Sequence, residues 1–227
     1  MRYLDAEKTL AAAEQLAWDA KDFDALSRLY MPLQEARRQI RQTCMDGVIR
    51  LNHLSYSPAQ QIDPAKILSD DPTGCFLLGG FASLIPAIQF RRIALDRQLY
   101  AETFLGAVFQ IGDGPHAGPV AEPFVVAILP TADAPLPHFQ VRSRAELLGQ
   151  LPPRSLLVGI AQLYKADAAF VFALWQKLHA PFLAEADAAA DPIQRMQLYR
   201  RTIQVDHACE LAHQKLSDTA RFLAQQR

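Results

Sequence analysis

The chain has 227 residues, half of them apolar, and a formal net charge of -1. This composition supports a hydrophobic core and excludes an intrinsically disordered chain. Nucleic-acid-binding proteins normally carry a surplus of basic residues, so the balanced charge argues against a nucleic-acid partner. The three cysteines lie far apart and form no CxxC motif, which favours reduced, buried thiols and a cytoplasmic protein.

Apolar residues recur every three or four positions through residues 1–47, which predicts a hairpin of two amphipathic helices. The first helix covers residues 4–19, and the second begins after Asp22 and ends at Gly47. We expect Pro32 to kink the second helix, because proline removes a backbone hydrogen bond.

A basic turn lies within the second of these helices. Arg37, Arg38 and Arg41 follow Glu35 closely in the sequence. We expect a solvated face on which these arginines pair with Glu35, because a nucleic-acid surface needs more charge and exposed aromatic rings.

Residues 48–158 form a central region in which apolar residues come in short runs cut by proline and glycine. The predicted elements are strand 48–51, helix 64–69, strand 75–78, helix 83–97, strand 100–111, strand 124–129, strand 139–141, helix 144–151 and strand 155–158. Residues 75–111 therefore predict two parallel strands joined by a crossover helix. We expect an α/β or α+β core, with a mixed, partly parallel sheet of about five strands, covering helices and helical hairpins at both ends.

Helical spacing returns over residues 159–227, and we expect this segment to pack with the N-terminal hairpin. A long helix over residues 160–188 is predicted to break at Pro181. Asp191 and Pro192 are typical of a helix start, and a last helix follows a corner at His207. The longest apolar run, 168–175, is far shorter than the ~20 residues of a membrane span, so no membrane partner is expected.

Residues 191–216 resemble the second helix of a tetratricopeptide repeat that continues into the first helix of the next repeat. The matching positions are Tyr199, Thr202, Ile203, Val205 and Asp206. Residues 21–30 resemble the same half-repeat. Residues 191–216 depart from the family pattern at two positions, where Arg195 replaces a small residue and His207 replaces a proline. The sequence also has no run of adjacent repeats. The resemblance implies repeat-like helical hairpins that bind a protein or peptide; the alternative is ordinary hairpins that pack the core.

Gly79, Gly80 and Ser83 form the strongest candidate ligand site in the sequence. A strand that ends in glycines before a helix lets backbone N–H groups converge on a phosphate or carboxylate. The pattern lacks both the GxGxxG spacing and the lysine of a phosphate-binding loop. The alternative is that the glycines make a tight turn and let the helix pack close to the sheet.

The sequence contains two weaker groups of chemically active residues. Asp113 and His116 lie on a glycine- and proline-rich loop, where an imidazole near a carboxylate can act as a general base. No serine or cysteine stands in a recognisable nucleophile setting, and Gly-Asp-Gly is also an ordinary turn sequence. The residues from His207 to His213 lack the HExxH order, so neither a metal site nor a cofactor is predicted.

Two functions stay open at this point. The first is an interaction or scaffold protein whose helical hairpins bind a protein, a peptide or a second copy of the chain. That function loses its basis if Tyr30, Trp175 and Tyr199 are all buried within the chain. The second is a binding protein or enzyme for a phosphate- or nucleotide-type ligand at Gly79, Gly80 and the start of the following helix.

Overall fold

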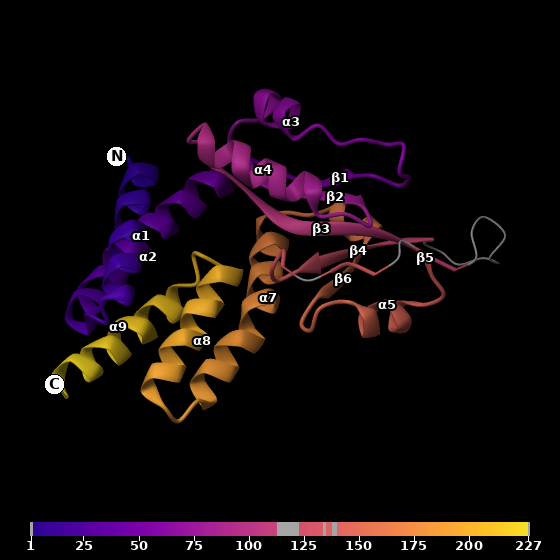
Figure 1. Cartoon of the computed structure of the whole chain (residues 1–227). Coiled ribbons are helices and arrows are strands. Elements are labelled where there is room, and N and C mark those ends of the chain that lie inside the picture. Colours follow the sequence, from indigo (N-terminus) through magenta and orange to yellow (C-terminus); the bar gives the residue numbers. More distant parts are fainter. Residues whose placement is uncertain (1, 113–122, 134, 138–139, 227) are drawn as a thin grey trace. The chain divides into compact units, whose positions relative to one another are not determined.

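The computed structural model describes residues 2–112, 123–133, 135–137 and 140–226 (Figure 1). The chain divides into two compact units. We call Met1–Gln42 together with Trp175–Arg227 the helical unit, and Thr43–Leu174 the sheet unit. The chain passes from one unit to the other within two helices, α2 (Phe23–Asp46) and α7 (Ala168–Ala188). Across the described ranges, no helix combines the length and apolar character needed to span a membrane.

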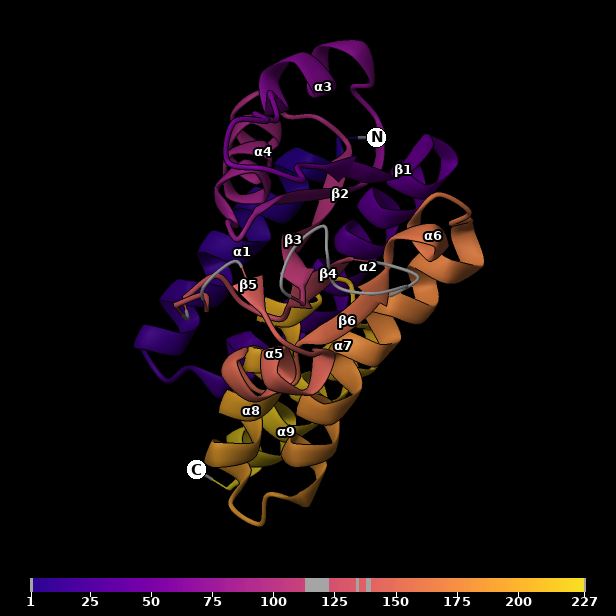
Figure 2. The same cartoon turned by 90° about the vertical axis from the view of Figure 1, so that its right-hand side faces the viewer.

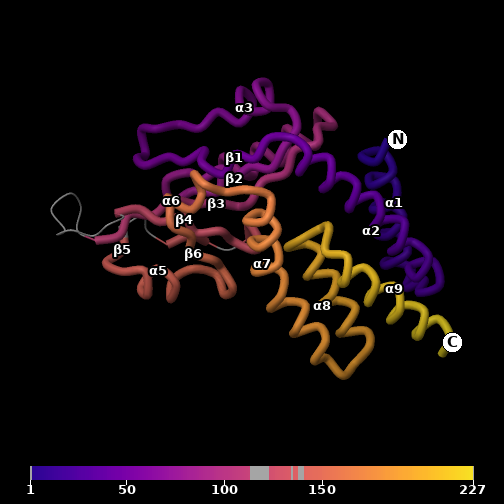
Figure 3. Tube along the Cα trace, turned by 180° about the vertical axis from the view of Figure 1, so that it is seen from behind, coloured from indigo at the N-terminus to yellow at the C-terminus, as the bar shows by residue number. Residues whose placement is uncertain are grey.

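The helical unit also contains α1 (Tyr3–Asp19), α8 (Pro192–Val205) and α9 (Glu210–Gln225). Its buried core joins apolar side chains from α1 and α2 with others from α8 and α9, and Figures 1 and 3 both show α9 alongside α1 and α2. The Asp191 carboxylate accepts a hydrogen bond from the Gln194 N–H, 2.7 Å away, and so caps α8. Segments from opposite ends of the sequence therefore share one core.

The predicted interruption of the long C-terminal helix at Pro181 was wrong. Helix α7 continues through Pro181, and the break falls earlier, between α6 (Ile160–Leu163) and the start of α7. The Asp167 carboxylate accepts a hydrogen bond from the Phe170 N–H, 2.8 Å away, which favours a new helix start there. Proline costs α7 one backbone hydrogen bond, and burial of neighbouring side chains such as Leu178 and Phe182 offsets that loss. Helix α2 likewise extends through Pro32.

The sheet unit is built on a mixed, partly parallel sheet, which confirms the predicted α/β fold. Its strands are β1 (Val48–Leu54), β2 (Gly74–Phe81), β3 (Ala101–Ile111), β4 (Phe124–Leu129), β5 (Gln140–Val141) and β6 (Leu156–Gly159). The strand order is β1-β2-β3-β4-β6, with β5 paired to β3. Strands β1, β2 and β3 are parallel, whereas β4 runs antiparallel to both β3 and β6.

Helices α3 (Pro64–Asp70), α4 (Ile85–Asp96) and α5 (Arg144–Gln150) lie on one face of this sheet (Figure 2). Helix α4 is the crossover between the parallel strands β2 and β3. The ring centroids of Phe76 in β2 and Phe90 in α4 lie 4.9 Å apart, within the main core of the unit. One face of β3, which carries Leu105, Ala107 and Phe109, lies in this core, and side chains on the other face, such as Phe104 and Val108, are also buried. Burial of both faces is typical of a parallel strand in the middle of a sheet.

Candidate functional site

The structure places Gly79 and Gly80 inside β2, whereas the sequence predicted that they follow the strand. They pair with Gly106 and Ala107 of β3. Gly79 also pairs with Leu54 of β1, and this pairing with parallel neighbours outweighs the weak strand preference of glycine. A Cβ atom at Gly80 would lie only 2.7 Å from the Ser83 carbonyl oxygen. Gly80 therefore lets the turn after β2 fold back closely against the strand.

Few backbone donors are left at the start of α4. The Ser83 N–H donates to the Gly80 carbonyl at 3.3 Å, and the Ser83 hydroxyl oxygen accepts from the Ile85 N–H at 3.2 Å. Pro86, in the first turn of α4, has no N–H at all. Because anion sites at helix ends depend on free N–H groups, this helix start is poorly suited to phosphate.

A pocket of about 280 Å³ opens beside these residues, at the carboxyl ends of the parallel strands β1 and β2. Its apolar lining is formed by the side chains of Pro58, Ile62, Phe81, Ile85 and Pro86. Its polar side chains are those of Ser55, Ser57, Gln60, Gln61, Ser83 and Gln89. None of the described residues that line it is charged. The pocket thus combines hydroxyl and amide groups with an apolar surface.

The loop that follows β1 forms a fixed wall of this pocket. The Ser55 N–H donates to the Gly79 carbonyl at 2.9 Å, and its buried hydroxyl lies within 2.8 Å of the Ser57 and Gln60 carbonyl oxygens. The Gln60 amide accepts from the Tyr56 N–H at 2.9 Å and donates to the Leu54 carbonyl at 3.2 Å. These bonds hold the loop in one shape before any ligand arrives.

Two pocket side chains are free to bind a ligand. Gln61, on the loop, and Gln89, on α4, are exposed, and neither side chain hydrogen-bonds to another residue of the described ranges. Sequence reasoning found Gly80 and Ser83 but missed the loop wall, because its residues lie more than 20 positions earlier in the chain. The other predicted pair, Asp113 and His116, lies outside the described residues.

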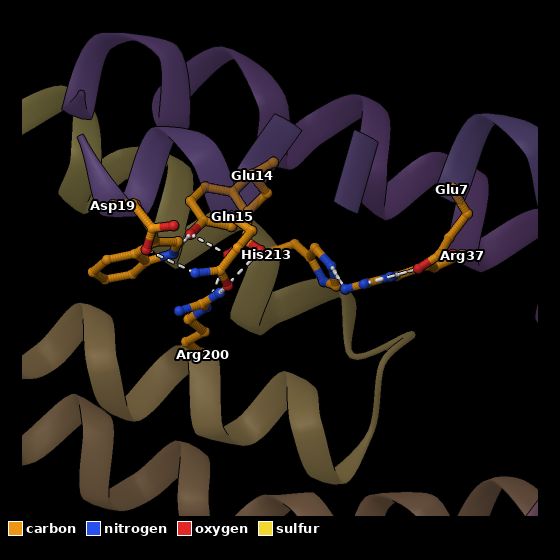
Figure 4. Close-up of polar contacts among 9 residues, drawn as sticks. Glu7, Glu14, Gln15, Asp19, Arg37, Arg200 and His213 are labelled. Atoms are coloured by element: carbon orange, nitrogen blue, oxygen red, sulfur yellow. Dashed lines mark hydrogen bonds and ion pairs between the residues drawn. The ribbon is translucent and has the colours of Figure 1, made fainter. Parts of the chain in front are cut away.

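The helical unit contains a network of charged side chains among α1, α2, α8 and α9 (Figure 4). An Arg37 guanidinium nitrogen lies 2.9 Å from Glu7 and another lies 3.3 Å from His213 Nε2, while Arg200 lies 3.0 Å from Glu14. His213 is fully buried, and this burial, with the Arg37 charge, lowers its pKa to about 4. The network therefore keeps His213 neutral at physiological pH.

The predicted solvated arginine face was wrong for two of its three members. Only Arg38 pairs with Glu35, at 2.8 Å on the surface. Arg37 is largely buried and turns to Glu7, and Arg41 is buried against Asp206. The reason is tertiary packing, because α8 and α9 belong to the same unit and cover this part of α2.

A second polar cluster lies around Asp206. An Arg41 nitrogen is 2.8 Å from Asp206 Oδ1, and the Arg41 guanidinium lies over the Trp175 ring, 4.5 Å from its centroid. His179 Nδ1 is 2.6 Å from Asp206 Oδ2. His179, Asp206 and Cys209 each offer one metal-ligating atom, and these atoms all lie within 4.8 Å of one another. Sequence reasoning missed this cluster because His179 is 27 residues from Asp206.

The electrostatics of this cluster keep Asp206 ionised. Burial would raise the Asp206 pKa, but the Arg41 charge and the hydrogen bond from His179 lower it to about 2. Burial would lower the His179 pKa, but the hydrogen bonds to Asp206 and Cys209 raise it to about 9. The cluster is therefore an anion held between two cationic groups.

The aromatic residues that the sequence suggested for a docking surface are buried. Tyr30, Trp175 and Tyr199 are 1%, 4% and 3% exposed, respectively. They are held by contacts of the helical unit, such as the hydrogen bond from Trp18 Nε1 to the Tyr30 hydroxyl at 2.8 Å. No partner can reach these rings without opening that unit.

The chain matches no protein-family model, and comparison with curated proteins and with solved structures finds none that is similar.

Proposed function

We propose that the sheet unit binds a small, uncharged molecule that carries hydroxyl or amide groups, in the pocket at the ends of β1 and β2. The observation that carries this proposal is the lining itself, which combines uncharged polar side chains with apolar ones. The volume of about 280 Å³ is close to the lower end of the range for small-molecule sites, about 300 Å³, so a ligand with one or two rings fits.

An uncharged ligand is favoured over a phosphate or nucleotide by the backbone at the start of α4. The Ser83 and Ile85 N–H groups are already bonded, and Pro86 has none to offer. The nearby Arg91 side chain donates to the Thr103 carbonyl at 2.7 Å. A phosphate would therefore lose its water shell without gaining enough donors in return. The glutamines Gln61 and Gln89 instead offer both donors and acceptors to a neutral ligand.

Matched pairs of compounds test the charge preference of the pocket. Glucose and glucose 6-phosphate, and adenosine and adenosine monophosphate, are compared by saturation-transfer NMR and calorimetry. We expect the neutral member of a pair to bind the protein at least ~10-fold more tightly than the phosphorylated member. This difference corresponds to a loss of about 1.4 kcal/mol of binding free energy when the phosphate is desolvated. Equal or tighter binding of the phosphorylated members contradicts an uncharged ligand, and a lack of binding by every compound at millimolar concentration contradicts a polar small-molecule pocket.

Variants of the two pocket glutamines test where the neutral compound binds. The change Gln61→Ala or Gln89→Ala is expected to weaken binding of the neutral compound by roughly 2–10-fold, because each removes one hydrogen bond. Gln150→Ala, on α5 and outside the pocket, is the matched control and is expected to bind like the unchanged protein. If the control weakens binding as much as the two pocket variants do, the ligand lies elsewhere.

A second candidate function is association of the chain with itself through the sheet unit. Binding by the repeat-like helical hairpins has lost its basis, because Tyr30, Trp175 and Tyr199 are buried. The observation that favours self-association is a row of exposed apolar side chains on α4. Ile85, Ile88 and Leu95 are 60%, 43% and 70% exposed, and their spacing places them along one side of the helix. We propose that this row pairs weakly with the same row of a second copy of the chain.

Sedimentation at increasing protein concentration tests this pairing. We expect a reversible dimer whose dissociation constant rises at least ~10-fold in Leu95→Ser, because one exposed leucine contributes about 1.5 kcal/mol or more when buried. Leu148→Ser, on α5, removes a similarly exposed leucine outside the row and serves as the control. A protein that stays monomeric at millimolar concentration contradicts the proposal.

The proposed location is the cytoplasm. Cys44, Cys75 and Cys209 are all buried thiols, which supports a protein that works in a reducing compartment.

A further inference from the structure

We propose that His179, Asp206 and Cys209 form a binding site for a divalent metal ion of the zinc type in the helical unit. This site lies among residues that are separate from the ligand pocket of the sheet unit, and it does not depend on the function proposed for that pocket.

Three helices bring the ligands together. His179 lies on α7, Asp206 follows the last residue of α8, and Cys209 precedes the first residue of α9. The Cys209 N–H donates to the Asp206 carbonyl at 3.0 Å, so the short turn between α8 and α9 holds both residues in place. Residues at such a turn are fixed by the backbone on either side, which limits the entropy that metal binding costs.

The ligand set favours zinc. One imidazole nitrogen, one carboxylate oxygen and one sulfur atom all lie within 4.8 Å of one another. Zinc binds these three kinds of atom at about 2.0–2.3 Å, whereas magnesium and calcium prefer oxygen alone. In a tetrahedral site with such bonds the ligand atoms are about 3.3–3.6 Å apart. The His179 and Asp206 atoms, now 2.6 Å apart, therefore have to separate by about 1 Å, which side-chain rotation provides.

Arg41 supports the site and does not compete with the metal for the same oxygen atom of Asp206. It bonds Asp206 Oδ1, whereas Oδ2 faces His179. Arg41 is itself held over the Trp175 ring. A hydrogen bond to the second oxygen of a ligating carboxylate is a common way to orient that ligand. The cysteine and aspartate are buried and the histidine is partly exposed, so three protein ligands leave a further position open for water on the histidine side.

Cobalt titration tests the site on the full-length protein. Co²⁺ reports a bound thiolate through an intense sulfur-to-metal absorption band and binds where zinc binds. We expect one Co²⁺ per chain, with a thiolate band that disappears when Zn²⁺ is added. As the ion enters, the thiol and the imidazole release their protons to solvent.

Variants assign the ligands. Cys209→Ser is expected to lose the thiolate band and to weaken cobalt binding by at least ~100-fold, and His179→Gln is expected to weaken it by at least ~10-fold. Serine is a favoured residue at the start of a helix, so Cys209→Ser should keep α9 intact, which circular dichroism checks. Cys75→Ala, in β2, is the control and is expected to retain the band.

Two results overturn the proposal. One is a folded protein that shows no thiolate band at millimolar Co²⁺, which leaves the cluster as a purely structural set of ion pairs. The other is a band that persists in Cys209→Ser, which places the metal on another cysteine. Neither result bears on the binding of neutral ligands by the sheet unit.

Discussion

Asp206→Asn is expected to lower the free energy of unfolding of the helical unit by about 3–5 kcal/mol. The Asp206 side chain is buried and bonds both Arg41, at 2.8 Å, and His179, at 2.6 Å. Asparagine keeps the shape of the side chain but removes the only charge on it. Arg41 then loses the carboxylate that lies 2.8 Å from its guanidinium, and removing one partner of a buried ion pair costs far more than the intact pair contributes.

Tryptophan fluorescence during urea unfolding measures this loss. Both tryptophans of the chain, Trp18 and Trp175, lie in the helical unit, so their signal follows that unit. Asp218→Asn removes a carboxylate that pairs with Arg221 on the surface of α9, and it serves as the control. We expect the control to unfold like the unchanged protein, because exposed ion pairs contribute little. An Asp206→Asn variant that unfolds like this control contradicts a stabilising role for the buried cluster.

The helical unit is expected to lose about 3 kcal/mol of stability as the pH falls from about 6.5 to about 4, through the titration of His213. The pKa of His213 is lowered from its ordinary value of 6.5 to about 4. Between these two values the unfolded chain binds a proton that the folded chain does not, so acid favours unfolding. The effect is absent above pH 6.5 and is complete below pH 4. Protonation places a second cation in a buried position beside Arg37, 3.3 Å away.

In the Asp206 cluster, the groups with shifted pKa values titrate outside this pH interval. His179, with a pKa raised to about 9, stabilises the folded state fully below 6.5 and loses that contribution as the pH rises through 9. Asp206, with a pKa lowered to about 2, stabilises it above 3.8 and loses that contribution as the pH falls through 2. The Asp206 cluster therefore adds little to the slope of stability between pH 4 and 6.5, and a His213 variant tests how much of that slope His213 supplies.

Urea unfolding followed by tryptophan fluorescence at several pH values measures this slope. His213→Gln is expected to flatten it, since glutamine does not titrate, although the variant is less stable than the unchanged protein at pH 7. The comparison uses the slope of each protein with pH, so a loss of stability common to all pH values does not affect it. An undiminished slope in His213→Gln assigns the acid sensitivity to another group.

Short-range signals in the sequence located much of the fold. The predicted helices 64–69 and 144–151 and the predicted helix start at Asp191 all begin where the observed helices do. In each case the capping side chain, that of Asp63, Ser143 or Asp191, accepts a backbone hydrogen bond from the first turn. Capping acts over three or four residues, so it is visible in a single sequence. The same holds for β4 (Phe124–Leu129), whose apolar run between loop residues matches the observed strand.

Features that depend on contacts between segments distant in the sequence were not predicted. Gly79 and Gly80 are typical of a turn, yet Gly79 pairs with both β1 and β3 and Gly80 pairs with β3, which keeps both residues in β2. Arg41 is typical of a surface residue, yet Asp206, 165 positions later, holds it in the interior. Strand pairing and buried charge pairs depend on which segments meet, and a local pattern carries no information on that choice.

The two candidate sites likewise depend partly on residues adjacent in the sequence and partly on the tertiary structure. The sequence alone pointed to the α/β class, to most helix starts, and to Gly80 and Ser83 as part of a ligand site, because each rests on residues adjacent in the chain. Only the tertiary structure brought the loop after β1 to Gly80 and joined His179 to Asp206 and Cys209. Both assemblies form where separate elements converge, and the burial of apolar surface that drives this convergence is a property of the whole fold.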